Sequence, residues 1–165
     1  LFNGGLLGGT EFGHTVVQVG GVRCTCGREG CLESYASATG LIRMAREQMD
    51  KHPDSLLWKL CDGDKRKVNA ELAFKASDEK DEAGILAVQE YMKYLAAGVA
   101  NAINMFRPEV VVLGGGISNR GEKLAAELNE MVKGECFGHT FVKPAEVVIA
   151  SLKNDAGIIG AAELC

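Results

Sequence analysis

Four potential metal ligands lie close together near the start of the sequence, and they constrain the fold more than any other feature. His14, Cys24, Cys26 and Cys31 fall within eighteen residues, in the pattern His-x9-Cys-x-Cys-x4-Cys. Zinc in proteins prefers four nitrogen or sulfur ligands in a tetrahedron, and a site in which the protein supplies all four is structural. We therefore predict a structural zinc site that staples this segment into a loop and leaves no position for a catalytic water.

Two glycines separate the last two cysteines of this cluster. Gly27 and Gly30 lie in the segment Cys-Gly-Arg-Glu-Gly-Cys at 26–31. A loop that folds back on a metal needs residues that accept a positive φ, and glycine does so at little steric cost. The metal is thus expected to fix a local turn.

Two acidic residues flank the cluster. Glu11 precedes His14 by three residues, and Glu33 follows Cys31 by two. If one ring nitrogen of His14 binds the metal, the other is free to donate a hydrogen bond. Carboxylates that accept and an imidazole that donates suit a sugar hydroxyl, which does both. We predict that Glu11, His14 and Glu33 bind a sugar, although an isolated Glu11 would be an ordinary solvated acid.

Size and composition exclude several classes of protein. The 165 residues suit one domain or one lobe of a larger protein, with 47% hydrophobic and 24% charged residues. A net charge of −4 gives no reason to expect nucleic acid, and no apolar run is long enough to cross a bilayer. The remaining cysteines show no pattern, so we expect a reduced, cytoplasmic setting. The chain begins at Leu1, not Met, and we expect a fragment.

Hydrophobic periodicity and turn residues predict the elements of the first half. Gly20-Gly21 is a favoured hairpin dipeptide, and Pro53 should end a helix that begins near Leu32. In order, we expect a hairpin at 1–9, paired strands at 15–19 and 22–24, helices at 32–51, 55–61 and 68–76, and a solvated charged turn at 78–81.

The second half is expected to contain a strand-helix-strand unit. A long amphipathic helix at 81–106 ends before Pro108, and its second face, with Tyr91 and Tyr94, is a candidate dimer surface. We then expect a strand at 110–113 buried on both faces, a helix at 121–133, a parallel strand at 146–150, and a helix at 156–164 capped by Asn154 or Asp155.

The glycine run after the first of these strands is a second candidate site. Gly114, Gly115 and Gly116 follow Val110–Leu113, and ligands in open α/β sheets bind beyond the carboxyl ends of the strands. The run matches neither a Walker loop nor Gly-x-Gly-x-x-Gly. A tight turn without a ligand is the alternative.

Five segments of the chain together resemble a known family. They are Glu-Phe-Gly-His at 11–14, Cys-x-Cys-Gly-x-x-Gly-Cys-Leu-Glu at 24–33, Tyr-Ala-Ser-Ala-Thr-Gly at 35–40, Val-Leu-Gly-Gly-Gly-Ile-Ser at 112–118 and Asn-Asp-Ala-Gly-Ile-Ile-Gly-Ala-Ala at 154–162. This set resembles the ROK family of bacterial sugar kinases and related repressors. Thr10 stands where the family commonly has a glycine.

The resemblance implies an α/β fold, namely the carboxyl-terminal lobe of an actin-like (ribonuclease H-like) sugar kinase. That lobe would have a mixed sheet, flanking helices and a zinc-stapled loop. Residues 1–165 would form a single domain, without the amino-terminal lobe. By the same resemblance, His14, Cys24, Cys26 and Cys31 match the zinc ligands, Glu11, His14 and Glu33 contact the sugar, and Gly114–Gly116 lie near the adenosine of ATP.

The activity implied is a glucokinase-type transfer of the γ-phosphoryl of ATP, with Mg²⁺, to a sugar hydroxyl. The family's phosphate loops and catalytic aspartate are not among these residues, so no catalytic residue is assigned and the fragment alone is expected to be inactive. Family kinases are often dimers, so we expect a homodimer. The alternatives are the sugar-binding effector lobe of a ROK repressor, and a zinc-stapled interaction domain.

Overall fold

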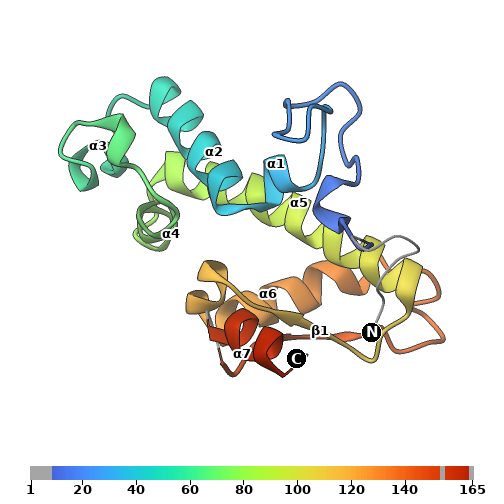
Figure 1. Ribbon diagram of the computed structural model, residues 1–165. Coiled ribbons are helices and arrows are strands. Elements are labelled where there is room, and N and C mark those ends of the chain that lie inside the picture. Colours follow the sequence, from blue (N-terminus) through green and yellow to red (C-terminus); the bar gives the residue numbers. More distant parts are fainter. Residues whose placement is uncertain (1–8, 153–154, 164–165) are drawn as a thin grey trace. The chain divides into compact units, whose positions relative to one another are not determined.

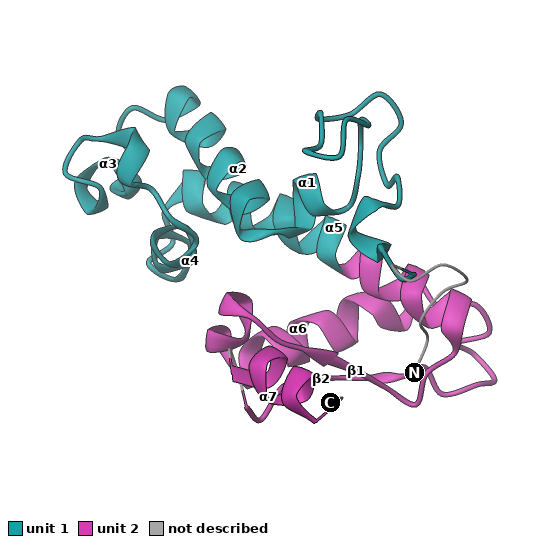
Figure 2. Ribbon diagram, viewed as in Figure 1, with its two compact units in different colours: residues 1–95 teal, residues 96–165 magenta. Residues whose placement is uncertain are grey.

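The computed structural model describes residues 9–152 and 155–163 and divides into two compact units. Unit 1 comprises residues 1–95 and unit 2 comprises residues 96–165 (Figure 2). Except for Gly9, the hairpin expected at 1–9 lies outside the described residues, as does Asn154. The assignment of both units to a single lobe stays a prediction.

Unit 1 consists mainly of helices (Figure 1). Its elements are η1 (Phe12–His14), α1 (Glu33–Ala36), α2 (Ala38–Lys51), α3 (Leu56–Leu60), η2 (Lys65–Lys67), α4 (Ala70–Asp78) and the first part of α5 (Glu82–Phe106). Fully buried side chains of α2, α3 and α4 form its core, among them Leu41, Met49, Leu57 and Ala73. Removing these apolar groups from water supplies the main stabilising energy of such a bundle.

The helix expected over residues 32–51 is interrupted at Ser37. This residue has an extended backbone (φ −104°, ψ 168°), and its side chain accepts a hydrogen bond from the N–H of Gly40 at 3.1 Å. A serine hydroxyl that satisfies a free N–H in the first turn of a helix is an N-cap. Ser37 therefore ends α1 and begins α2.

The strand hairpin expected at 15–24 is wrong. Among the described residues of this segment the pairing consists of isolated bridges, Val16 with Cys31 and Arg23 with Glu29. Both bridges join the segment to the residues around Cys31. Backbone groups of both expected strands bond to Gly30 instead of to each other: the Gly30 carbonyl accepts from Val17, and the Gly30 N–H donates to the carbonyl of Val22.

The charged turn before α5 is not simply solvated. One carboxylate oxygen of Asp81 accepts the Leu56 N–H at 2.8 Å, and the other accepts the Ser55 hydroxyl at 2.8 Å and the Gly84 N–H at 2.9 Å. Asp81 thus caps α5 and ties it to the start of α3.

Helix α5 confirms the long helix expected at 81–106, but one prediction for its faces is wrong. Tyr91 is 2% exposed and its ring lies edge-on to Phe74 of α4, with ring centroids 6.1 Å apart. It belongs to the core of unit 1 and is not available to a partner subunit.

Unit 2 contains the expected strand-helix-strand unit. Strands β1 (Val110–Leu113) and β2 (Glu146–Ile149) are parallel, in the register Val110 with Glu146 and Leu113 with Ile149. Between them lie η3 (Gly116–Arg120) and α6 (Glu122–Lys133), and α7 (Ala156–Ala162) follows β2. Asp155 precedes α7, but its side chain makes no capping hydrogen bond within the described part of the chain.

The small sheet is covered by α6 (Figure 1). Asn129 of α6 donates to the carbonyl of Val147 at 2.8 Å and accepts its N–H at 2.9 Å, so one side chain fastens the helix to β2. β1 was expected to be buried on both faces, but Val110 and Val112 are 45% and 56% exposed. The mixed sheet is also not found among the described residues, where the two strands are parallel. No helix in the described part of the chain is long and apolar enough to cross a membrane.

Candidate functional site

Backbone hydrogen bonds fold residues 15–31 into a closed loop. The carbonyl of Gly30 accepts from Val17 at 2.8 Å, and the N–H of Gly30 donates to Val22 at 2.8 Å. Cys24 donates to the carbonyl of Arg28 at 2.7 Å. These bonds bring the two ends of the cysteine segment together.

The glycines between the cysteines adopt the conformation expected of them. Gly27 and Gly30 have φ values of +90° and +80°. A Cβ added at Gly30 would overlap the carbonyl of Gln18, so this position requires glycine for space as well as for φ.

The loop brings all four predicted ligands together. One atom from each of His14, Cys24, Cys26 and Cys31 lies within 4.8 Å of the others. The Cys24 sulfur is 3.5 Å from Nδ1 of His14, and the sulfurs of Cys26 and Cys31 are 3.6 Å apart. In tetrahedral zinc sites, metal–ligand bonds of about 2.0 to 2.3 Å place the ligand atoms roughly 3.4 to 3.8 Å from one another. The donor set and these two distances are therefore compatible with zinc.

The thiols of Cys24 and Cys31 have pKa values shifted in opposite directions. A hydrogen bond from the backbone N–H of Cys26 is the main cause that lowers the pKa of the Cys24 thiol to about 6. Burial is the main cause that raises the pKa of the Cys31 thiol to about 11. Thiolates bind zinc, so Cys24 is ready to bind at neutral pH while a proton on Cys31 must be displaced.

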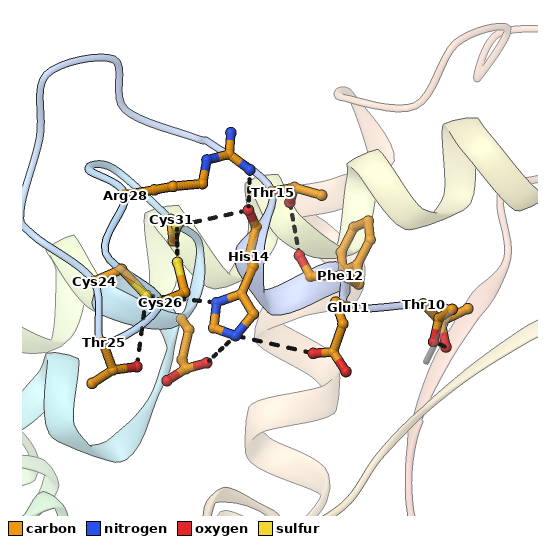
Figure 3. A network of polar contacts seen from close by, with 12 residues as sticks. Thr10, Glu11, Phe12, His14, Thr15, Cys24, Thr25, Cys26, Arg28 and Cys31 are labelled. Carbon is orange, nitrogen blue, oxygen red and sulfur yellow. Dashed lines mark hydrogen bonds and ion pairs between the residues drawn. The ribbon is translucent and has the colours of Figure 1, made fainter. Parts of the chain in front are cut away.

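The imidazole of His14 lies between the cysteines and the acidic side chains (Figure 3). Its Nδ1 faces Cys24, while its Nε2 is 3.6 Å from a carboxylate oxygen of Glu33 and 4.0 Å from one of Glu11. The side chains of Glu33 and Glu11 are 45% and 73% exposed, so a ligand can reach them. The three predicted sugar-binding side chains thus gather on one side of the cluster.

Two further residues support this arrangement and were not identified as site residues from the sequence. Arg28 donates from Nη1 to the carbonyl of His14 at 3.3 Å, and the hydroxyl of Tyr35 accepts the N–H of Val22 at 2.7 Å. Both contacts join residues more than ten positions apart, so the local spacing of residues does not reveal them.

Thr10, next to Glu11, has a strained backbone. Its φ is +69°, in the left-handed region, which costs about 1 to 2 kcal/mol for a residue with a Cβ. Glycine avoids this cost but loses about 0.4 to 1 kcal/mol through the freedom of the unfolded chain. We expect Thr10→Gly to raise the free energy of unfolding by about 0.5 to 1 kcal/mol, measured by chemical denaturation.

Thr140 offers a matched control, because it is an exposed threonine outside the left-handed region. Thr140→Gly should lower the free energy of unfolding, since it relieves no strain. An equal decrease in the free energy of unfolding in both variants would show that the backbone of Thr10 is not strained.

The glycine run lies in unit 2, at the carboxyl end of β1. Gly115 has φ +73°, and Gly116 begins η3. An added Cβ at either residue would meet no atom within 4 Å among the described residues. Ser118 closes the turn, since its hydroxyl donates to the carbonyl of Gly115 at 2.6 Å. The run is therefore a tight turn with open space beside it, at the edge of the sheet where ligands bind in α/β folds.

Fold and site together define an α/β protein with a cysteine and histidine cluster beside two carboxylates. The family model described as "ROK family" matches residues 1–165. The glucokinase of Thermotoga maritima is 42% identical over 156 residues, which cover 94% of this chain and 49% of that protein. The chain belongs to the ROK family.

Solved structures show the same fold. The crystal structure of a ROK family glucokinase from Streptomyces griseus in complex with glucose and AMPPNP matches with a TM-score of 0.86 and 30% identity, covering 95% of this chain and 51% of that one. A xylose repressor of Caldicellulosiruptor bescii is also similar, at 27% identity over 97% of this chain and 39% of the repressor. The chain spans about half the length of the curated glucokinases it matches.

Proposed function

We propose that the protein containing this chain is an ATP-dependent hexose kinase of the glucokinase type. The observation that carries the proposal is the position of His14, whose two ring nitrogens face a four-ligand cluster on one side and two carboxylates on the other. The similarity to glucokinases supports the sugar as substrate.

Zinc would be held by His14, Cys24, Cys26 and Cys31 and would supply folding energy to the loop, because the protein provides all four ligands. With Nδ1 of His14 as a metal ligand, the ring proton would lie on Nε2, which would then be a fixed donor. Each carboxylate oxygen, at 3.6 Å (Glu33) or 4.0 Å (Glu11) from Nε2, would leave room for a hydroxyl oxygen about 2.8 Å from both it and Nε2. Because a hydroxyl has one proton to donate, the two carboxylates would accept from different hydroxyls. Glu11 and Glu33 would then accept from sugar hydroxyls, and His14 would donate.

ATP and Mg²⁺ would act at the other predicted site. Gly114, Gly115 and Gly116 would lie near the adenosine, where the turn after β1 leaves open space. In phosphoryl transfer of this kind an aspartate takes the hydroxyl proton, while Mg²⁺ and backbone amides balance the phosphate charge. No residue of the chain is proposed for the part of the aspartate.

A coupled assay of the complete polypeptide that contains this chain tests the proposal. With ATP and Mg²⁺, we expect ADP formation that depends on glucose, and none from the 165-residue chain alone. Glucose binding without phosphorylation would instead favour the alternative, the effector lobe of a ROK repressor, which the similarity to a xylose repressor supports. The absence of both binding and phosphorylation would favour a zinc-stapled interaction domain.

A homodimer in the cytoplasm remains part of the proposal. The surface first expected for the dimer loses Tyr91, which is buried in unit 1. Sedimentation of the complete polypeptide would determine its oligomeric state.

A further inference from the structure

Tyr35 of α1 is buried, and its hydroxyl contacts the loop of residues 15–31. Its exposed fraction is 4%, and its hydroxyl accepts the N–H of Val22 at 2.7 Å. Val22 lies two residues before Cys24, so this bond holds the backbone that leads directly into the cluster.

The ring of Tyr35 is fixed from two sides. Tyr94 of α5 packs against it, with ring centroids 4.2 Å apart and an angle of 31° between the planes. The guanidinium of Arg43 lies 5.4 Å from the ring centroid, and Arg43 is itself paired with Glu47 at 2.7 Å. An aromatic ring held by stacking and by a cation has little freedom, so its hydroxyl occupies a defined position.

Val22 links the Tyr35 hydroxyl to the backbone near both Cys24 and Cys31. Its N–H is bound to Tyr35, and its carbonyl accepts the N–H of Gly30 at 2.8 Å. Gly21 lies so close that an added Cβ would overlap the Tyr35 hydroxyl. The Tyr35 hydroxyl thus positions both the segment before Cys24 and, through Val22, the turn before Cys31.

We propose that Tyr35 is a positioning residue for the metal cluster, and through His14 for the sugar-binding carboxylates. It belongs to the same short helix as Glu33, so one element places both a carboxylate and the hydroxyl that holds the ligand loop. This inference rests on the proposed metal site and on the proposed sugar site beside it.

Tyr35→Phe tests the proposal, because it keeps the ring and removes the hydroxyl that accepts the Val22 N–H. The complete polypeptide is loaded with Co²⁺ as a spectroscopic probe, and release to a chelator is followed by the loss of visible absorption. An N–H left without its partner should speed release about tenfold and alter the Co²⁺ spectrum. The KM for glucose should rise with kcat nearly unchanged.

Tyr91→Phe is the matched control, since Tyr91 is another buried tyrosine of unit 1, and its ring lies edge-on to Phe74 of α4. It should leave the Co²⁺ spectrum and its release unchanged, whatever its effect on melting. Wild-type release from Tyr35→Phe, or equal acceleration in both variants, would overturn the positioning role. Absence of kinase activity in the unmutated complete polypeptide would refute the proposed function, but the comparison of Co²⁺ release between the two variants would still test the positioning role.

Discussion

Cys31→Ser is expected to abolish metal binding at the proposed zinc site and to lower the melting temperature of the protein by roughly 10 °C. Cys31 is fully buried, and its sulfur lies 3.6 Å from that of Cys26, at the centre of the proposed site. A ligand that binds only the folded state stabilises it by about 4 kcal/mol when its free concentration is a thousand times its Kd. For a domain of this size each kcal/mol corresponds to about 2 to 4 °C.

Two measurements separate loss of metal from loss of a buried side chain. A strong chelator should lower the melting temperature of the wild type towards that of Cys31→Ser, and should have no effect on the variant. Cys61→Ala is the control, because Cys61 is a buried thiol of unit 1 outside the cluster. It should keep one metal ion per chain. A full metal content in Cys31→Ser, with wild-type melting, would refute the structural zinc site.

Metal loss should also weaken sugar binding, although zinc touches no sugar atom in the proposed arrangement. His14 is shared, with Nδ1 turned to Cys24 and Nε2 to Glu33. Without the metal, the ring loses the contact that sets its tautomer and orientation. An apoprotein that binds glucose as tightly as the metal-loaded form would show that the cluster and the sugar site are independent.

The candidate site was predictable from the sequence because its donors are close together along the chain. The spacing of His14, Cys24, Cys26 and Cys31 is a property of the chain itself, and the structure brings the four together. The path of the chain between them was not predictable. Val16 pairs with Cys31 and Arg23 pairs with Glu29, not with each other's segment across Gly20-Gly21. Hairpin propensity is a property of the turn residues alone and does not predict pairing with a later segment.

For the helices too, local features were predictable from the sequence and long-range contacts were not. The positions of α4, α5 and α6 agree with apolar periodicity, which is a local signal. The break at Ser37 depends on one hydroxyl, and the burial of Tyr91 depends on Phe74 of another helix. The exposure of Val110 and Val112 in β1 likewise depends on which elements pack against the sheet. A continuous β-branched run predicts a strand but does not state how many of its faces are covered.

Glu33→Gln and Glu11→Gln are each expected to lower kcat/KM for glucose roughly 10- to 100-fold in the complete polypeptide. A hydrogen bond to a charged group is worth about 1.5 to 3 kcal/mol, and the amide keeps the shape of the side chain while an NH₂ donor replaces one acceptor oxygen, so this bond is lost. Both carboxylates face Nε2 of His14. If they hold neighbouring hydroxyls of one sugar, the double variant should lose less than the product of the single losses.

Glu29→Gln is the matched control for these variants. Glu29 is an exposed acid of the same loop, between Cys26 and Cys31, and the acids that pair with His14 in the described part of the chain are Glu11 and Glu33. It should retain both metal and wild-type kinetics. The glutamine variants should retain one metal ion per chain while they lose glucose affinity, which separates them from Cys31→Ser. Unchanged glucose affinity in Glu11→Gln and Glu33→Gln, with metal retained, would place the sugar elsewhere and leave the cluster as a staple alone.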